Sequence, residues 1–532
     1  MLSSAANTWV QKLFRFRGKS NTYIAKFRKF VTLPATFNGQ HVQPQKIFGI
    51  PYNVIPLRWQ SLALTGFTIL NLIFMFADYD VFDTDSQSKT AMYRRYIADR
   101  TGIIATALCV PLFLFAGRNN ILMYLSGWSF ETFNVFHRWV GRWMMLQSAV
   151  HGIAYSFQYA LAQGHAFYVQ RIWHLHSIFA GTLATLIAGI MCILAFYPLR
   201  HHFYETFLIL HIGLSIVFVY YVYIHCVAFG YAQYMYCMVA IWGFDRFVRI
   251  LRILYAGLKI NAKVTVYGDA VYLTVKPMLH MKPKPGQYAY IYLMKYKFWE
   301  SHPFSVMQDK DGSYVFVTRA EKGMTKYLRD RVSKMENQEG TVSVWIEGWY
   351  GEEYPIKLYD TILLVGGGIG VTAVMHYALH LNKHLREGQH VIFLWVVRGQ
   401  DNLKWAKDQV EELSRDGRID IRIYARGCEK SNTEKVHQLS DSDSAELSSS
   451  DKEADHSSLS SGGSWSGVTM NYEDRPDLEE IIHTTIVEAP SSVAVVTCGP
   501  GSLADTCRHA VAANVEKGNG HVDYFEDAFS WA

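Results

Sequence analysis

Apolar and polar positions divide this chain of 532 residues into two halves. Residues 57–255 contain long apolar runs, whereas residues 256–532 alternate short strand-like and helix-like patterns with polar loops, as a soluble α/β region does. About 20 apolar residues are needed to cross a bilayer. The first half therefore predicts a membrane-spanning helical bundle of about six spans, near residues 58–77, 100–118, 133–157, 173–197, 204–227 and 233–254.

The soluble half contains two successive patterns. Closely spaced alternating stretches such as GQYAYIYL and SYVFVTRA predict a small β-barrel. Further on, TILLVGGGIGVTAVMHYALHLNKHL followed by HVIFLWVVR has the order strand, glycine loop, helix, strand, which is typical of a parallel α/β sheet. We expect a basic N-terminal segment at 1–57, a transmembrane domain at 58–255, a barrel at 256–355, an α/β domain at 356–532 and a Ser-rich disordered insertion at 429–470.

Basic residues indicate which side of the membrane faces the cytoplasm. Residues 1–58 contain no acidic residue, and a basic leader followed by apolar spans favours a cytoplasmic membrane flank over a nucleic-acid partner or an import signal. Six arginines fall on the same side if the N-terminus is cytoplasmic: Arg118, Arg138, Arg200, Arg246, Arg249 and Arg252. An even number of spans then puts the soluble half in the cytoplasm. The seven cysteines are scattered and predict neither a disulfide framework nor a zinc site.

Four histidines lie inside the apolar spans at matched spacing. His137 and His151 are fourteen residues apart on one span, and His211 and His225 repeat that spacing on another. Fourteen helical steps of about 100° return a side chain to within about 40° of the same face, about 21 Å along the axis. The two spans run in the same direction, so His137 can face His211 at one depth and His151 can face His225 at the other.

Facing imidazoles at two depths predict two haem b groups, because a haem iron takes one neutral nitrogen from each side. A hydrogen bond to a neighbouring helix is the alternative for any single histidine. Two matched pairs favour metal ligation, since polar groups inside a bilayer are costly. A further row, His376, His380 and His384, has helical spacing in the soluble half, where a solvated helix face is favoured over a metal site.

Two stretches of the soluble half suit a flavin. HPFS follows the strand GQYAYIYL, and the stretch RAEKGMTKYL offers glycine and threonine at the expected start of a helix. A helix N-terminus opened by glycine, with a hydroxyl beside it, suits a pyrophosphate. The candidate FAD-binding residues are His302, Pro303, Phe304, Ser305, Gly323 and Thr325.

A glycine run between an apolar strand and a helix predicts a dinucleotide loop. The run GGGIGVT lacks the GxGxxG spacing, so a structural glycine turn is the alternative. The next strand ends in Arg398, and a cation there favours the 2′-phosphate of NADPH over NADH. In VVTCGPGS, Cys498 precedes a second glycine turn, where a nicotinamide edge can lie. The candidate NADPH residues are Gly366, Gly367, Gly368, Gly370, Thr372, Arg398, Gly499 and Pro500, with Cys498 as a catalytic candidate.

Taken in order, these motifs resemble those of fungal ferric reductases and their relatives, the NADPH oxidases, from about residue 100 to the C-terminus. The resemblance implies haem ligation by the paired histidines, flavin binding by HPFS, and NADPH binding by GGGIGVT and CGPGS. It also implies that Trp531 or Phe529 in the tail YFEDAFSW stacks on the flavin, which makes Trp531 a second catalytic candidate. The chain has Trp349 where relatives usually have proline, so the loop joining the two soluble domains is expected to differ.

We therefore expect a multi-pass membrane oxidoreductase that passes electrons from NADPH through FAD and two haems to an acceptor on the far side. Ferric or cupric chelates are the first candidate acceptor, in the plasma membrane or an endomembrane, and oxygen is the second. The family's oxidases tend to have a histidine where this chain has Tyr155, which favours metal, while His165 and Arg171 keep oxygen open. A non-catalytic membrane protein is the alternative of another class. The sequence leaves the oligomeric state open.

Overall fold

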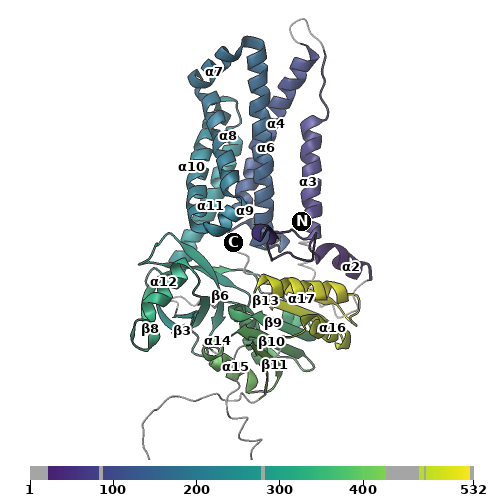
Figure 1. Ribbon diagram of the computed structural model, residues 1–532, viewed down its shortest axis with the longest axis vertical. Coiled ribbons are helices and arrows are strands. Elements are labelled where there is room, and N and C mark those ends of the chain that lie inside the picture. The colour runs from purple at the N-terminus through teal and green to yellow at the C-terminus, as the bar shows by residue number, and fades with distance from the viewer. Residues whose placement is uncertain are drawn as a thin grey trace, which may run out of the picture.

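The computed structural model describes residues 22–82, 88–276, 282–398, 401–426, 467–472 and 475–527. Long helices stand side by side above a region that contains a closed barrel and an open sheet (Figure 1). Trp531, Phe529 and most of the predicted insertion fall outside the described residues.

Six long helices of the described chain correspond to the six predicted spans: α3 Arg58–Phe76, α4 Lys89–Ala116, α6 Phe130–Gln163, α8 His176–Leu194, α10 Tyr204–Ala228 and α11 Ala232–Ala256. By length and composition, α3, α4, α8 and α10 are suited to cross a membrane. Arginines lower the hydropathy of α6 and α11, which stand in the same bundle (Figure 1). Short helices connect the bundle: α5 Ile121–Ser126, α7 His165–His174 and α9 Tyr197–His202. Many apolar side chains on its outer surface are exposed, as lipid contact requires.

The described part of the basic N-terminal segment packs on the α/β domain. It forms α2 Thr22–Phe27, a π-helical turn Arg28–Thr32 and a hairpin of β1 Gln45–Ile47 with β2 Ile50–Asn53. Arg28 pairs with Asp523, and Lys29 Nζ lies 2.5 Å from Glu516 Oε2. The cytoplasmic membrane flank stays a prediction, and these two cations of the segment bind acidic residues more than 480 positions away.

The structure confirms the β-barrel that the alternating stretches of the soluble half predicted. Its strands are β3 Ile260–Tyr267, β4 Ala270–Val275, β5 Tyr288–Leu293, β6 Ser301–Gln308, β7 Tyr314–Arg319 and β8 Glu339–Tyr350, closed in the order β3-β4-β7-β6-β5-β8. Inward-facing Val264, Leu273 and Phe316 form its core, and helix α12 Gly323–Val332 packs against it. Trp349 adds its ring to this core, stacking on Phe316 and meeting Tyr314 edge-on.

The α/β domain is a parallel sheet with helices on both faces, as the βαβ pattern predicts. The strands β9 Thr361–Gly367, β10 His390–Arg398, β11 Ile419–Arg426, β12 Val468–Asn471, β13 Val493–Cys498 and β14 Val522–Glu526 lie in the order β12-β11-β10-β9-β13-β14. The helices are α13 Val371–His384, α14 Asp401–Trp405, α15 Lys407–Ser414, α16 Leu478–Glu488 and α17 Gly501–Asn514. Every residue of β9 is buried, which is usual for a central parallel strand.

One predicted boundary is wrong by a few residues. The Ser-rich insertion was expected to reach residue 470, but β12 begins at Val468 and pairs with β11, with Ile421 opposite Val468. Val468 and Met470 pack against the hydrophobic core of the sheet, so the low-complexity composition hides a short strand at its end.

Candidate functional site

The four bundle histidines form the two predicted pairs. The ring centroids of His137 and His211 are 6.3 Å apart, and those of His151 and His225 are 5.9 Å apart. A metal–imidazole bond of about 2 Å puts each ring centre about 3 Å from the metal, so rings on opposite sides of one iron lie about 6 Å apart. Both pairs therefore have the separation that bis-imidazole ligation requires.

Three of the four rings are fixed by a main-chain carbonyl. The Nδ1 atom of His137 lies 2.9 Å from Leu112 O, that of His151 lies 2.7 Å from Ala98 O, and that of His225 lies 2.8 Å from Ser177 O. An Nδ1–H that donates to a carbonyl leaves Nε2 with its lone pair free for a metal. The Nδ1 atom of His211 has no hydrogen-bond partner among the residues that the structure describes.

Two glycines make room for the outer pair. A β-carbon on Gly102 of α4 would lie 2.6 Å from His151 Nδ1, and one on Gly181 of α8 would lie 2.5 Å from His225 Nδ1. Such contacts are too short for real β-carbons, so each ring rests directly on a helix backbone. The separations, the free nitrogens and this cradle fit a haem between His151 and His225. The inner pair shares the separation, but only one of its rings has a carbonyl partner.

The flavin motif lies on β6, in the middle of the barrel wall. Pro303 is opposite Tyr290 of β5, and its neighbours His302 and Phe304 are opposite Ile291 and Ala289. Phe304 is buried in the barrel core, so its ring supports the strand. His302 Nε2 lies 3.6 Å from Glu205 Oε1 on α10, and burial lowers the pKa of His302, which keeps the ring neutral.

The expected pyrophosphate site lies at the start of α12. Gly323 has a φ of 56° and open space around its Cα, while the Thr325 hydroxyl donates to Lys322 O at 3.1 Å. Arg319 ends β7 four residues earlier and is exposed, with its Nε 2.8 Å from Asp269 Oδ2. Arg319 is not among the FAD-binding residues that the sequence predicted. Its place between a strand and a helix opened by glycine is nevertheless typical of an anion site.

The two predicted nucleotide loops meet at the carboxyl edge of the sheet. Gly366 of β9 is in register with Cys498 of β13. A β-carbon on Gly370 would lie 2.7 Å from Gly499 Cα, and one on Gly367 would lie 2.7 Å from Pro500 Cδ. The chain leaves β9 towards β10 on one side, while β13 lies on the other. This reversal of strand order is where open α/β sheets bind dinucleotides.

Three further predicted residues have different positions relative to these loops. Thr372 is buried, and its hydroxyl donates to Ile369 O at 3.0 Å in the turn that leads into α13. Arg398 is exposed at the carboxyl end of β10, beside β9, where a 2′-phosphate is expected. Cys498 is fully buried under the second turn, and burial raises the pKa of its thiol well above the usual range. Burial thus favours the neutral thiol at Cys498, and its catalytic role stays a prediction.

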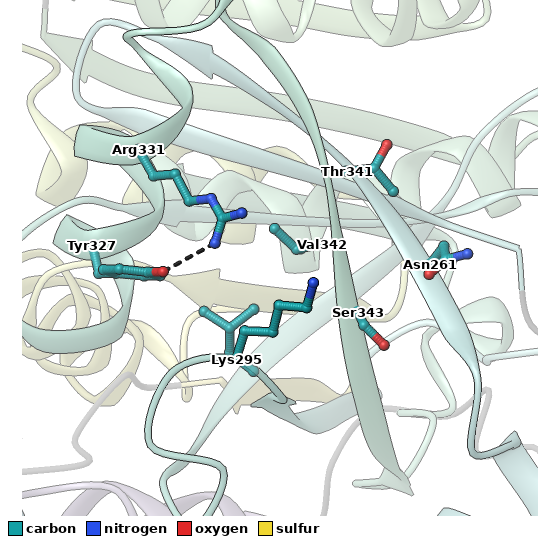
Figure 2. Close-up of a pocket in the computed structure, with 8 residues that line it drawn as sticks. Asn261, Lys295, Tyr327, Arg331, Thr341, Val342 and Ser343 are labelled. Atoms are coloured by element: carbon teal, nitrogen blue, oxygen red, sulfur yellow. Dashed lines mark hydrogen bonds between the residues drawn. The ribbon is translucent and has the colours of Figure 1, made fainter.

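A separate hollow lies between α12 and the strands β3 and β8. Figure 2 shows its cationic residues, Lys295 and Arg331, with Arg331 donating to the Tyr327 hydroxyl at 3.0 Å. Its lining contains none of the residues that the sequence proposed for a cofactor. The hollow therefore lies outside the candidate site.

Comparison with known proteins agrees with this domain order. The family model described as ferric reductase like transmembrane component matches residues 101–222, an FAD-binding domain matches 255–354, and a ferric reductase NAD binding domain matches 359–512. Histidine pairs in a membrane bundle, a flavin-type barrel and a nucleotide-type sheet together define a transmembrane oxidoreductase.

Curated relatives match almost the whole chain. Ferric reductase transmembrane component 3 of Saccharomyces cerevisiae is 32% identical over 522 residues, which cover 95% of this chain and 71% of the relative. Ferric/cupric reductase transmembrane component 2 of the same yeast is 32% identical over 524 residues, with the same coverage. Ferric/cupric reductase transmembrane component 1 of Candida albicans is 29% identical over 95% of this chain and 67% of its own length. The chain belongs to the family of ferric reductase transmembrane components.

Proposed function

We propose that this protein transfers electrons from cytoplasmic NADPH through FAD and two haems to ferric or cupric chelates on the other side of the membrane. The proposal rests on one observation. Two pairs of imidazole rings lie at two depths of the bundle, above a flavin-type barrel and a nucleotide-type sheet. The matched family models and the names of the curated relatives support the same activity.

Each cofactor has candidate residues. His137 with His211 would hold the inner haem, and His151 with His225 the outer one. Pro303, Ser305, Gly323, Thr325 and Arg319 would bind FAD, while the glycine loops and Arg398 would bind NADPH. Flavin accepts two electrons as hydride and releases them singly, which is the chemistry that joins nicotinamide to haem iron.

The protein's own groups set the conditions for this transfer. The carbonyls of Leu112, Ala98 and Ser177 hold three imidazoles in the tautomer that leaves Nε2 unprotonated. The backbones of Gly367 and Gly370 lie close to the second turn, which shapes the floor on which nicotinamide would rest.

The surroundings of the outer pair favour metal over oxygen as the acceptor. The Tyr155 ring lies 5.2 Å from the His151 ring, and its hydroxyl donates to Asp99. The family's oxidases tend to have a histidine at this position, which is occupied here by a phenol paired with a carboxylate. We further propose the plasma membrane as the location, because chelate reduction there would serve metal uptake. Imaging a tagged protein separates this location from an endomembrane.

The test is NADPH-driven Fe(II) formation by membranes that contain the protein, with and without superoxide dismutase. Iron reduction that persists with dismutase is the expected result. Complete loss of Fe(II) on adding dismutase would assign the acceptor as oxygen. Reduced-minus-oxidised spectra of the same membranes should contain a bis-histidine haem signal, and its absence would leave only a non-catalytic protein.

A further inference from the structure

A buried carboxylate joins the membrane bundle to the barrel. Glu347 lies on β8 and has no exposed surface, yet it accepts four hydrogen bonds. Two come from guanidinium groups at the foot of the bundle: Arg118 Nη1 at 2.9 Å and Arg249 Nε at 3.0 Å, both to Oε1. Two come from phenols of the barrel, Tyr292 to Oε2 at 2.5 Å and Tyr350 to Oε1 at 2.7 Å. We call Glu347 with these four partners the junction cluster.

Charge balance keeps Glu347 ionised. Burial alone would raise its pKa, but the two guanidinium groups and the two phenols outweigh burial and lower the pKa to about 2. The Arg118 guanidinium also lies over the Tyr290 ring, 3.3 Å from the centroid. A buried carboxylate with two cations becomes costly when one member is removed, because the others stay desolvated and unpaired.

The junction cluster lies in one row with the flavin motif. In the barrel wall, Tyr290 of β5 is opposite Glu347 on one side and opposite Pro303 on the other. Glu347 is thus two strands away from the HPFS motif at the same level. Arg118 extends this link, because its Nη2 lies 3.4 Å from Ser301 Oγ at the start of β6.

The cluster is also connected to the inner histidine pair, along α4. Leu112 of α4 holds His137 through its carbonyl, and Arg118 follows just beyond the end of that helix. Arg249 belongs to α11, which contacts β8. One carboxylate is therefore connected through Arg118 to the helix that orients an inner ligand and through Tyr290 to the strand that carries the flavin motif.

A second set of contacts supports the same joint. Arg252 of α11 donates to Asn119 Oδ1 at 3.0 Å and to Trp349 O at 2.8 Å. Asp245 accepts from the Asn119 backbone at 2.9 Å, which fixes the turn after α4. The sequence assigned these arginines to the inner membrane surface, but the structure uses Arg118, Arg249 and Arg252 to hold the barrel.

We propose that Glu347 is a positioning residue that fixes the flavin barrel against α4 and α11, and thereby sets the rate of electron transfer from flavin to the inner histidine pair. This inference rests on the proposed function. It concerns one step of that function, the electron transfer from flavin to haem, and not the preceding hydride transfer from NADPH to flavin.

The test is Glu347→Gln in the full-length protein, which keeps the shape and removes the charge. Under anaerobic stopped flow, flavin bleaching by NADPH should stay within about twofold of the parent, whereas haem reduction should slow by about tenfold or more. The kcat for Fe(II) formation should fall with the haem rate while kcat/KM for NADPH stays unchanged, so that the KM for NADPH falls together with kcat. Hydrogen exchange of residues 343–350 should become faster in the resting protein, a readout that needs no turnover.

The matched control is Glu339→Gln on the same strand, where the carboxylate is exposed and pairs with Lys263 at 2.9 Å. It should leave both half-reactions and the exchange unchanged. If Glu347→Gln does not retain flavin, Arg249→Lys decides, because it keeps the charge but cannot reach Glu347 and Tyr292 together. Its expected result is the same split between half-reactions with a smaller factor.

Equal haem reduction in Glu347→Gln and the parent would overturn the inference, as would an equal loss of both half-reactions in the Arg249→Lys protein. The proposed function fails separately. In that case the parent protein itself shows no NADPH-dependent haem reduction, whatever the variants do.

Discussion

The membrane half and the soluble half build their candidate sites in different ways. In the bundle, side chains on rigid helices supply the ligand atoms, and the helix period sets where they lie. In the α/β domain, the backbone of two glycine turns supplies the site, and the order of strands sets where the turns meet. Both sites depend on glycine, because Gly181 leaves room for an imidazole ring and Gly370 leaves room for the backbone of the second turn.

This difference teaches which half depends on single side chains. A histidine ligand has no substitute in its helix, whereas a backbone site is altered chiefly by adding atoms where none fit. Substitutions of the two kinds should therefore remove different half-reactions, which can be measured separately as NADPH-to-flavin transfer and as reduction across the membrane.

The largest effect is expected from His151→Ala. It removes one ligand of the outer pair while the inner pair and the soluble half stay intact. Ferric reduction should be abolished, flavin reduction by NADPH should persist, and membrane spectra should lose about half of the haem signal. His174→Ala is the control, because His174 lies at the end of α7 and is exposed. Retained ferric reduction in His151→Ala would contradict the ligand assignment.

The next effect is expected from Gly370→Ala. Its φ of −61° suits alanine, so the only obstacle is the new β-carbon, 2.7 Å from Gly499 Cα. Forcing two backbones apart costs about 1–3 kcal/mol, which corresponds to a loss of roughly 5- to 150-fold in NADPH-to-flavin transfer.

Dithionite should still reduce the haems of Gly370→Ala fully, because the bundle is unchanged. Gly388→Asn is its control, since Gly388 lies in a turn with a φ of 74° and open space around it. Normal NADPH kinetics in Gly370→Ala would show that the two turns do not define the nucleotide floor.

A glycine-to-alanine substitution in the bundle should impair ferric reduction and leave NADPH-to-flavin transfer normal. Gly181→Ala puts a β-carbon 2.5 Å from His225 Nδ1, so the ring must move from its carbonyl partner. We expect a shifted or weakened outer haem spectrum and about a tenfold loss of ferric reduction, with normal flavin reduction. Gly213→Ala on α10 has no atom within 4 Å and serves as the control. If Gly181→Ala and Gly213→Ala have equal haem spectra, Gly181 does not shape the site of the outer haem.

The sequence predicted the parts of the structure that repeat a local rule. The fourteen-residue spacing predicted both histidine pairs, alternation predicted the barrel, and the strand–glycine–helix order predicted the parallel sheet. Contacts between distant segments gave no such signal. Glu347 has the neighbours of an ordinary strand, and its ion pair with Arg118 spans 229 positions.

The sequence also did not predict which side chains are buried by another domain. His376, His380 and His384 have the spacing of one helix face, and a solvated face was the favoured interpretation. That interpretation is wrong for His376, because α13 lies between the sheet and the barrel and His376 is buried there, with Nδ1 2.9 Å from Val306 O of β6. His384 on the same helix is exposed.

The smallest effect, a pH dependence confined to the soluble half, follows from His376. Burial lowers its pKa to about 4 from the ordinary 6.5, although the bond to Val306 acts in the opposite direction. Because the folded-state pKa lies below the unfolded one, the full stability is present above pH 6.5 and declines as the pH falls towards 4. The loss should be on the order of 3 kcal/mol at most.

Thermal unfolding of the full-length protein between pH 7 and pH 4 measures this decline. In His376→Asn the amide can still donate to Val306 O but does not titrate, so the decline should be smaller than in the parent. His384→Asn, about two turns further along the same helix, should leave it unchanged. If His376→Asn and the parent lose stability in parallel, His376 is not the group whose protonation destabilises the soluble half at low pH.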